Sequence, residues 1–169
     1  MEILLSQISE EEKLFEFDEQ SASIGLPSEF GHVVACIYIY SLGQKYVVHG
    51  RVDVDVHLTC DICLDEFDKH FQEKFDVIVD RVPMPKDPNE DEVIYLSPKA
   101  LSINFNDYIR DQLFLALPIQ KRCRSDCKGL CPVCGANLNR EQCGHKTKRL
   151  DPRWETLKAL KIKIQTLES

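Results

Sequence analysis

Two Cys-x-x-Cys pairs constrain this chain more than any other feature. Cys60 pairs with Cys63 and Cys131 with Cys134, among 8 cysteines in 169 residues. Disulfide-rich scaffolds are small secreted domains, whereas this chain is longer and lacks the basic flank and apolar stretch of a secretory signal. We therefore expect reduced thiols that bind a metal, in a cytoplasmic protein.

The run Cys131-Pro132-Val133-Cys134-Gly135 is the strongest metal signal. Two thiolates three residues apart can hold one ion, and the glycine permits a turn whose backbone amides approach the sulfurs. Cys143 and His145 offer a second close pair. We predict a Cys₃His zinc site made of Cys131, Cys134, Cys143 and His145. A site with four protein ligands is closed, so it is structural rather than catalytic.

Four further cysteines are enough for a second tetrahedral site. They are Cys60, Cys63, Cys123 and Cys127. Spacing does not fix the grouping, because Cys60 and Cys63 could instead share an ion with Cys131 and Cys134, and Cys123 and Cys127 with Cys143 and His145. The sequence thus predicts one zinc ion, and two if this second set also binds. Cys36, within an apolar run, is expected to be a buried small hydrophobe.

Strand patterns dominate the first hundred residues. Residues 33–40 are β-branched and aromatic, and residues 45–59 alternate between apolar and polar. A largely alternating pattern resumes at residues 67–83, which predicts an antiparallel return with Cys60 and Cys63 at the hairpin tip. Residues 1–30 indicate only a short strand and irregular structure, and a short strand is expected at residues 92–96 after a proline-rich loop.

Two helices complete the expected fold. Asn104 can cap one over residues 104–117, which ends before Pro118 and should cover one face of the sheet. Asp151 can cap a basic amphipathic helix over residues 151–169. The predicted class is α+β: an antiparallel β-rich body with flanking helices and a C-terminal zinc-knuckle module. We divide it into a body (1–120), a basic zinc module (121–150) and the last helix (151–169).

Charge is distributed unevenly along the chain. Residues 1–120 hold 9 Lys and Arg against 23 Asp and Glu, whereas residues 121–163 hold 12 against 4. Such asymmetry indicates a nucleic-acid-facing segment on an acidic body, and its plainer interpretation is a solvated basic surface. The residues predicted to face RNA are Lys128, Arg140, Lys146, Lys148, Arg149 and Arg153.

Positive signals for catalysis are missing from the sequence. It shows no nucleophile-base arrangement, Gly-rich phosphate loop or His-Glu-x-x-His pattern, so we expect no enzyme. A redox Cys-x-x-Cys would need a βαβ context, and a metal hydrolase would need an incomplete ligand set. No apolar run is long enough for a membrane helix. The strand histidines are expected to be surface or packing residues: His32, His49, His57 and His70. Asp53 and Asp55 are expected to be solubilising charge.

The stretch from Leu115 through Cys127-Lys128-Gly129-Leu130-Cys131-Pro132-Val133-Cys134-Gly135 resembles the YceD family of bacterial and plastid proteins. The likeness includes Leu58 to Leu64 upstream and Asp151 to Trp154 downstream, and so covers roughly residues 45 to 163. Family members often end the knuckle with Cys-x-Cys, where this chain has His145.

The resemblance implies a role in the accumulation of large-subunit ribosomal RNA. The leading hypothesis is therefore a non-enzymatic factor in the synthesis or processing of that RNA or in ribosome assembly, with ribosomal RNA or a pre-ribosomal particle as partner. The runner-up is a zinc-stabilised adaptor whose acidic body docks a basic ribosomal protein of the large subunit.

Overall fold

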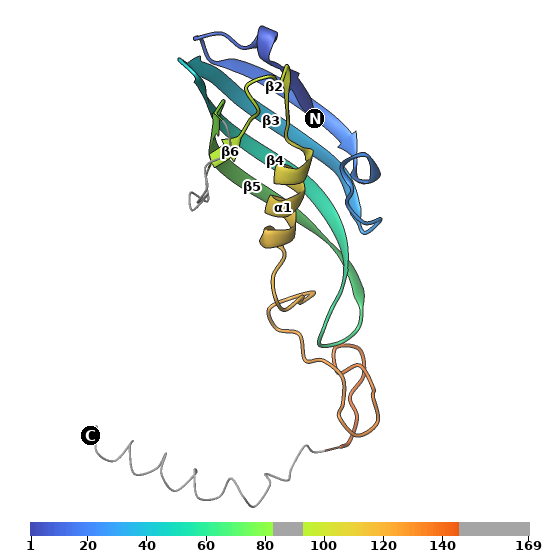
Figure 1. The fold of residues 1–169 in the computed structure, drawn as a ribbon. Coiled ribbons are helices and arrows are strands. Elements are labelled where there is room, and N and C mark those ends of the chain that lie inside the picture. The colour runs from blue at the N-terminus through green and yellow to red at the C-terminus, as the bar shows by residue number, and fades with distance from the viewer. Residues whose placement is uncertain (83–92, 146–169) are drawn as a thin grey trace, which may run out of the picture.

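The structure, a computed structural model, describes residues 1–82 and 93–145. Its body is a five-stranded sheet in the order β2-β3-β4-β5-β6, accompanied by a two-stranded sheet of β1 and β7 and by one α-helix, α1 (Figure 1). The strands are β1 (Glu2–Leu4), β2 (Lys13–Gln20), β3 (Phe30–Leu42), β4 (Lys45–Thr59), β5 (Glu66–Asp80), β6 (Val93–Tyr95) and β7 (Ser102–Asn104). The helices are the 3₁₀ turns η1 (Leu5–Gln7) and η2 (Ser21–Ile24), and α1 (Asn106–Ala116).

The predicted antiparallel β-rich body is confirmed, since β2 to β5 pair antiparallel in sequence order. Two features differ from expectation. Residues 13–20 belong to the stretch 1–30, for which a short strand and irregular structure were predicted. They form the eight-residue edge strand β2, whose Phe15 and Phe17 pack against the core while charged residues alternate with them. The short strand β6 pairs parallel with the end of β5, rather than antiparallel.

The long hairpin of β4 and β5 follows directly from the alternating sequence. The two strands pair without interruption from Lys45 opposite Asp80 to Thr59 opposite Glu66. One face of β4 is buried and includes Val48, Val52 and Val54. Because all fifteen residues of each strand are paired, the hairpin carries its tip, residues 60–65, well away from the core.

Helix α1 lies across the inner face of the sheet (Figure 1). Its Ile109 and Leu113 are fully buried, and the Tyr108 ring meets the Phe75 ring edge to face at 5.2 Å. The helix begins at Asn106, with Phe105 in the cap position. Asn104, predicted to cap the helix, lies one residue before that position, and its side chain accepts a hydrogen bond of 2.9 Å from the Asn106 amide at the start of the helix. The predicted helix over residues 151–169 and the loop over residues 83–91 lie outside the described residues.

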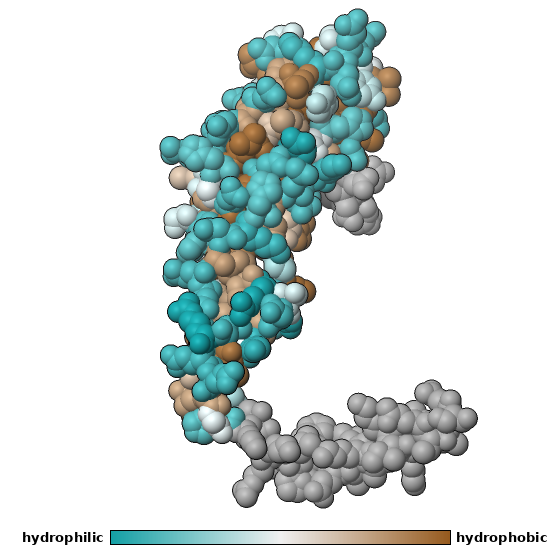
Figure 2. All heavy atoms as spheres, turned by 180° about the vertical axis from the view of Figure 1, so that it is seen from behind, coloured by the Kyte–Doolittle hydropathy of each residue, from teal (hydrophilic) through white to brown (hydrophobic). Residues whose placement is uncertain are grey.

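The outer face of the sheet is covered by no element that the structure describes. Figure 2 shows this side, on which hydrophilic groups predominate with apolar groups among them. The four strand histidines lie here, exposed as expected, and the Nδ1 atom of each contacts an aspartate. The pairs are His32–Asp18, His49–Asp76, His57–Asp68 and His70–Asp55.

Cys36 also belongs to the outer face, where it is half-buried. The expectation of a buried Cys36 was wrong because its neighbours Ala35 and Ile37 occupy the inward positions of β3. Within the described part of the chain, no helix is long and apolar enough to cross a lipid bilayer.

Candidate metal centres

Eight potential metal ligands gather in two groups of four at the end of the long hairpin. We call Cys60, Cys63, Cys123 and Cys127 the hairpin site, and Cys131, Cys134, Cys143 and His145 the module site. In each group the ligand atoms all lie within 4.8 Å of one another. No cysteine of the chain forms a disulfide.

The two Cys-x-x-Cys turns share one backbone geometry. The carbonyl of Cys60 accepts a hydrogen bond from the Leu64 amide at 2.9 Å, and the carbonyl of Cys131 accepts one from the Gly135 amide at 2.8 Å. The residue after the second cysteine is left-handed in both turns, with φ of 60° at Leu64 and 73° at Gly135. This region is readily adopted by glycine but costs an L-residue such as leucine about 1–2 kcal/mol, so Leu64 is held in a locally unfavourable conformation.

Backbone amides aimed at the first sulfur of each turn favour its thiolate. Burial opposes ionisation of Cys60, but amides of Cys123, Cys63 and Ile62 outweigh it and lower the pKa of the Cys60 thiol to about 6. Amides of Cys134 and Val133 likewise lower the pKa of the Cys131 thiol to about 6. A metal binds the thiolate, so the first cysteine of each turn is prepared for ligation.

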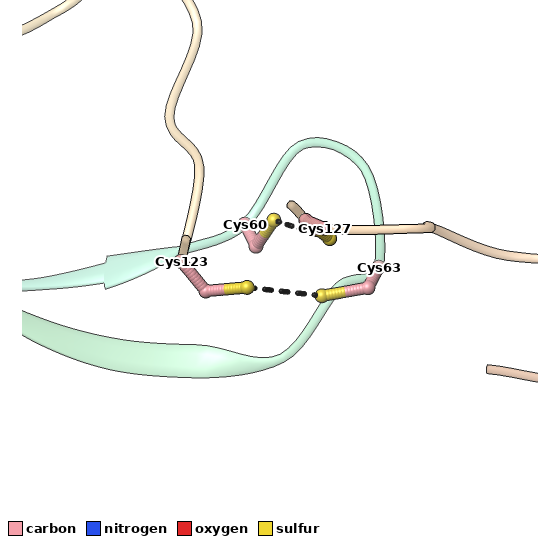
Figure 3. A group of neighbouring side chains, drawn as sticks. All are labelled: Cys60, Cys63, Cys123 and Cys127. Atoms are coloured by element: carbon pink, nitrogen blue, oxygen red, sulfur yellow. Dashed lines mark hydrogen bonds between the residues drawn. The ribbon is translucent and has the colours of Figure 1, made fainter. Parts of the chain in front are cut away.

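The hairpin site joins two distant parts of the chain (Figure 3). Cys60 and Cys63 come from the hairpin tip, and Cys123 and Cys127 from the segment that follows α1. The Sγ atoms of Cys60 and Cys127 are 3.9 Å apart, and those of Cys63 and Cys123 are 3.6 Å apart. A tetrahedral ion with metal–sulfur bonds of 2.3 Å sets sulfur–sulfur edges of about 3.8 Å. The spacing therefore fits a four-thiolate metal site.

The module site is assembled from a shorter stretch of chain and is more open. Cys131 is buried and Cys143 half-buried, whereas Cys134 and His145 are exposed. Its turn is closed by a hydrogen bond of 2.8 Å from the Cys131 amide to the Ala136 carbonyl. Three thiols and one imidazole fit the donor set of a Cys₃His site.

Polar contacts fasten the segment of residues 121–145, here called the module, to the hairpin tip. The Asp61 amide donates to the Lys121 carbonyl at 2.8 Å, and the Lys121 amide donates to Asp61 Oδ2 at 2.7 Å. The Leu130 amide donates to the Ile62 carbonyl at 3.1 Å. These contacts hold the hairpin tip and the module together beside the hairpin site.

Asp65 provides a further link that the sequence did not reveal. Its Oδ2 accepts a hydrogen bond from Asn137 Nδ2 at 2.9 Å, and its Oδ1 accepts one from Arg140 Nη2 at 2.7 Å. Nothing in the cysteine spacing marks this residue, because its partners lie more than seventy positions away along the chain.

Two ways of grouping the eight ligands were compatible with the sequence. The structure has the one in which Cys60 and Cys63 lie beside Cys123 and Cys127. Lys128 is exposed, and Arg140 is exposed while paired with Asp65. The remaining residues predicted to face RNA lie beyond the described part of the chain: Lys146, Lys148, Arg149 and Arg153.

Comparison with known proteins shows a family match over most of the chain. The model described as large ribosomal RNA subunit accumulation protein YceD matches residues 48–161. An uncharacterized protein of Mycobacterium tuberculosis is 45% identical over 56 residues, which are 33% of this chain and 27% of that protein. No solved structure matches the chain significantly.

A plant relative carries a functional name. It is the large ribosomal RNA subunit accumulation protein YCED homolog 1, chloroplastic, of Arabidopsis thaliana, 32% identical over 78 residues, or 46% of this chain and 24% of that protein. The maize protein of the same name is 35% identical over 54 residues, or 32% of this chain and 18% of that protein. The matched segments thus span about a quarter or less of the length of these curated relatives.

Proposed function

The chain belongs to the YceD family, and on that premise we propose that it is a non-enzymatic factor for large-subunit ribosomal RNA. It would act in the synthesis or processing of that RNA or in ribosome assembly, through a zinc-stabilised module that presents a basic surface to the RNA. The observation that carries this proposal is the attachment of the basic module to the body by the hairpin site.

Zinc is the ion that suits both donor sets. Cys60, Cys63, Cys123 and Cys127 would hold one ion, and Cys131, Cys134, Cys143 and His145 a second. Thiolate and imidazole donors in groups of four are typical of structural zinc. Four protein ligands leave no coordination position for water or substrate, so the role proposed for the ions is to hold the fold. Small modules of this kind gain on the order of 10 kcal/mol of folding free energy from zinc.

Exposed cations on the module support the RNA-facing role. Arg122, Arg124 and Lys128 are exposed, and no ion pair that the structure describes engages Lys128. Lysine and arginine that neutralise phosphates release counterions, which makes the affinity fall as salt rises. Lys128, exposed and engaged in no ion pair among the described residues, is therefore well suited to a phosphate contact.

Native mass spectrometry of the intact protein tests the zinc proposal. We expect two zinc ions in the wild type and one in the Cys60→Ser variant. Cys36→Ser is the matched control, because Cys36 lies on the outer face and belongs to neither group, so it should keep both ions. A wild-type protein purified without any bound metal would refute the assignment.

Filter binding to large-subunit ribosomal RNA at several salt concentrations tests the RNA role. We expect the affinity to fall steeply with salt, and Lys128→Glu to lower both the affinity and the salt slope, the slope by about one unit. Lys74→Glu on β5 changes the net charge equally and should have little effect. An affinity for RNA that changes neither with the salt concentration nor in either variant would contradict the proposal.

A protein-binding adaptor is the second candidate, favoured by the outer face of the sheet. Leu14 and Tyr38 pair across β2 and β3 and are exposed, and Leu42 and Ile78 are exposed on the same face. An apolar group of this kind beside many carboxylates suits a basic protein partner. RNA-free large-subunit ribosomal proteins, purified singly, should then bind the wild type but not Tyr38→Lys.

A further inference from the structure

The long strand β5 is paired along only a short part of its outer edge. Its inner edge pairs with β4 from Glu66 to Asp80, whereas its outer edge pairs with β6 only at Ile78–Asp80 (Figure 1). Among the residues that the structure describes, no strand pairs with the outer edge between Glu66 and Val77. Backbone N–H and C=O groups along such an edge are a template for a further strand.

Several charged residues of this edge lack a partner of opposite charge. No ion pair among the described residues engages Lys69, Glu73 or Lys74. The Nζ atom of Lys69 lies instead 5.0 Å from the centroid of the Phe71 ring, on the inner face of the sheet. Lysines and inward-pointing charges often keep other strands away from an edge, so the decisive point is what a second strand would place opposite them.

We propose that this edge pairs antiparallel with the same edge of a second copy of the chain, about a twofold axis at Phe71. The axis places Lys69 of each copy opposite Glu73 of the other, and Asp68 of each copy opposite Lys74 of the other. Opposite charges that face each other directly stabilise an antiparallel strand pair. The inference goes beyond the proposed RNA function and does not rest on it.

The same register also aligns the aromatic residues of the inner face. Phe71 of one copy faces Phe71 of the other, and Phe67 faces Phe75. Aromatic pairs across two strands stabilise a sheet further. Moving the axis by one residue would place Phe71 opposite Lys69 or opposite Glu73, and both kinds of favourable pair would be lost. The self-complementary pattern therefore specifies one register.

The edge strand at the other side of the sheet, β2, offers no comparable register. An axis at Glu16 places this residue opposite its own copy, and an axis at Phe17 places Glu16 opposite Asp18. Like charges directly opposite each other destabilise a strand pair. On β5 the like-charged Glu66 and Asp76 meet only at the two ends of the paired stretch. A second copy of the chain thus suits the edge of β5 and not that of β2.

Sedimentation equilibrium of the full chain over a range of protein concentrations tests the proposal. We expect a reversible equilibrium between monomer and dimer. Lys69→Glu should weaken the dimer by about tenfold or more, because the axis repeats the resulting pair of like charges twice, and Glu73→Lys should do the same. Combining Lys69→Glu with Glu73→Lys exchanges the two charges and restores both pairs. The double variant should dimerise within about threefold of the wild type.

Lys13→Glu is the matched control, since the Nζ atom of Lys13 lies 5.1 Å from the Phe15 ring centroid on β2, as Lys69 lies over Phe71 on β5. It should leave dimerisation unchanged. A wild type that stays monomeric at every concentration refutes the interface, and so does a dimer that both single substitutions leave intact. A double variant no tighter than the single ones refutes the register.

RNA binding measured on the same variants separates this inference from the proposed function. The basic module is not part of the β5 edge, so each variant should keep the salt-dependent RNA binding of the wild type, counted per chain. A wild type that dimerises but binds no RNA would refute the proposed function and support the interface. A monomeric wild type that binds RNA would do the reverse.

Discussion

At Gly129 both the backbone conformation and a neighbouring residue oppose any side chain. Gly129 has φ of 73° and lies between Cys127 of the hairpin site and Cys131 of the module site. A Cβ added to it would come within 2.5 Å of Ile62 Cγ2 and 3.0 Å of the Ile62 carbonyl oxygen. Gly129→Ala therefore forces both a left-handed alanine and a clash with the hairpin tip.

The size of the effect follows from three contributions. Left-handed backbone at an L-residue costs about 1–2 kcal/mol, and overpacking about 1–3 kcal/mol. Alanine also lowers the conformational entropy of the unfolded chain, which offsets about 0.4–1 kcal/mol of this loss in stability. The middle values of these ranges give a net loss of about 3 kcal/mol, which corresponds to a drop of roughly 100-fold in affinity for the proposed zinc ion, if its binding requires this conformation.

Two other glycines of the module separate the contributions. Gly135 has the same φ of 73° but open space around it, so Gly135→Ala should lose only the backbone part, about 0.5–1 kcal/mol. Gly144 has open space and no left-handed φ, so Gly144→Ala should be neutral or slightly stabilising.

Competition for zinc by a chromogenic chelator measures the three affinities under one set of conditions. Hydrogen exchange at the Leu130 amide, which donates to the Ile62 carbonyl, gives a second reading, because it reports the packing of the module on the hairpin tip directly. The expected order of loss is Gly129→Ala, then Gly135→Ala, then Gly144→Ala. If Gly129→Ala behaves like Gly144→Ala in both assays, the hairpin tip and the module do not pack together as the structure has them.

Three further predictions concern the body and its attachment. Gly50→Ala should destabilise the sheet by about 1–3 kcal/mol in urea unfolding, because its Cβ would lie 2.1 Å from the buried Phe75 ring; an unchanged midpoint would contradict that packing. Asp65→Ala removes the acceptor of Asn137 and Arg140 and should cost about 1–3 kcal/mol of module protection in hydrogen exchange, with β3 unaffected; equal loss in both would point to general destabilisation instead. The Asp68 carboxylate hydrogen bonded to His57, aided by Glu66, raises the pKa of His57. Its stabilising effect is complete below the unfolded pKa of about 6.5 and is lost as pH rises through the folded pKa. The urea midpoint should thus fall more between pH 6 and 8 in the wild type than in His57→Gln, and parallel curves would refute the contribution.

Local patterns predicted the local structure well. The apolar and polar alternation of residues 45–59 predicted a strand that the structure has at Lys45–Thr59, because a two-residue period buries one face of a strand. The pattern did not predict the strand at Lys13–Gln20, since an edge strand is only half-buried and its charged residues obscure the alternation. Nor could it predict that Val93–Tyr95 runs parallel to β5, because that depends on the path of the chain between them.

The Cys-x-x-Cys spacing alone predicts that Cys60 lies beside Cys63 and Cys131 beside Cys134, since two cysteines three residues apart on a tight turn present their sulfurs together whatever surrounds them. The order of charged residues likewise shows that the C-terminal part of the chain is basic. Which cysteine pairs meet depends on the tertiary structure. Cys60 and Cys127 lie 67 positions apart, and spacing cannot encode a contact over that separation. The packing of α1 on the sheet and the Asp61–Lys121 hydrogen bonds direct the chain back to the hairpin tip, and so attach the basic module to the acidic body.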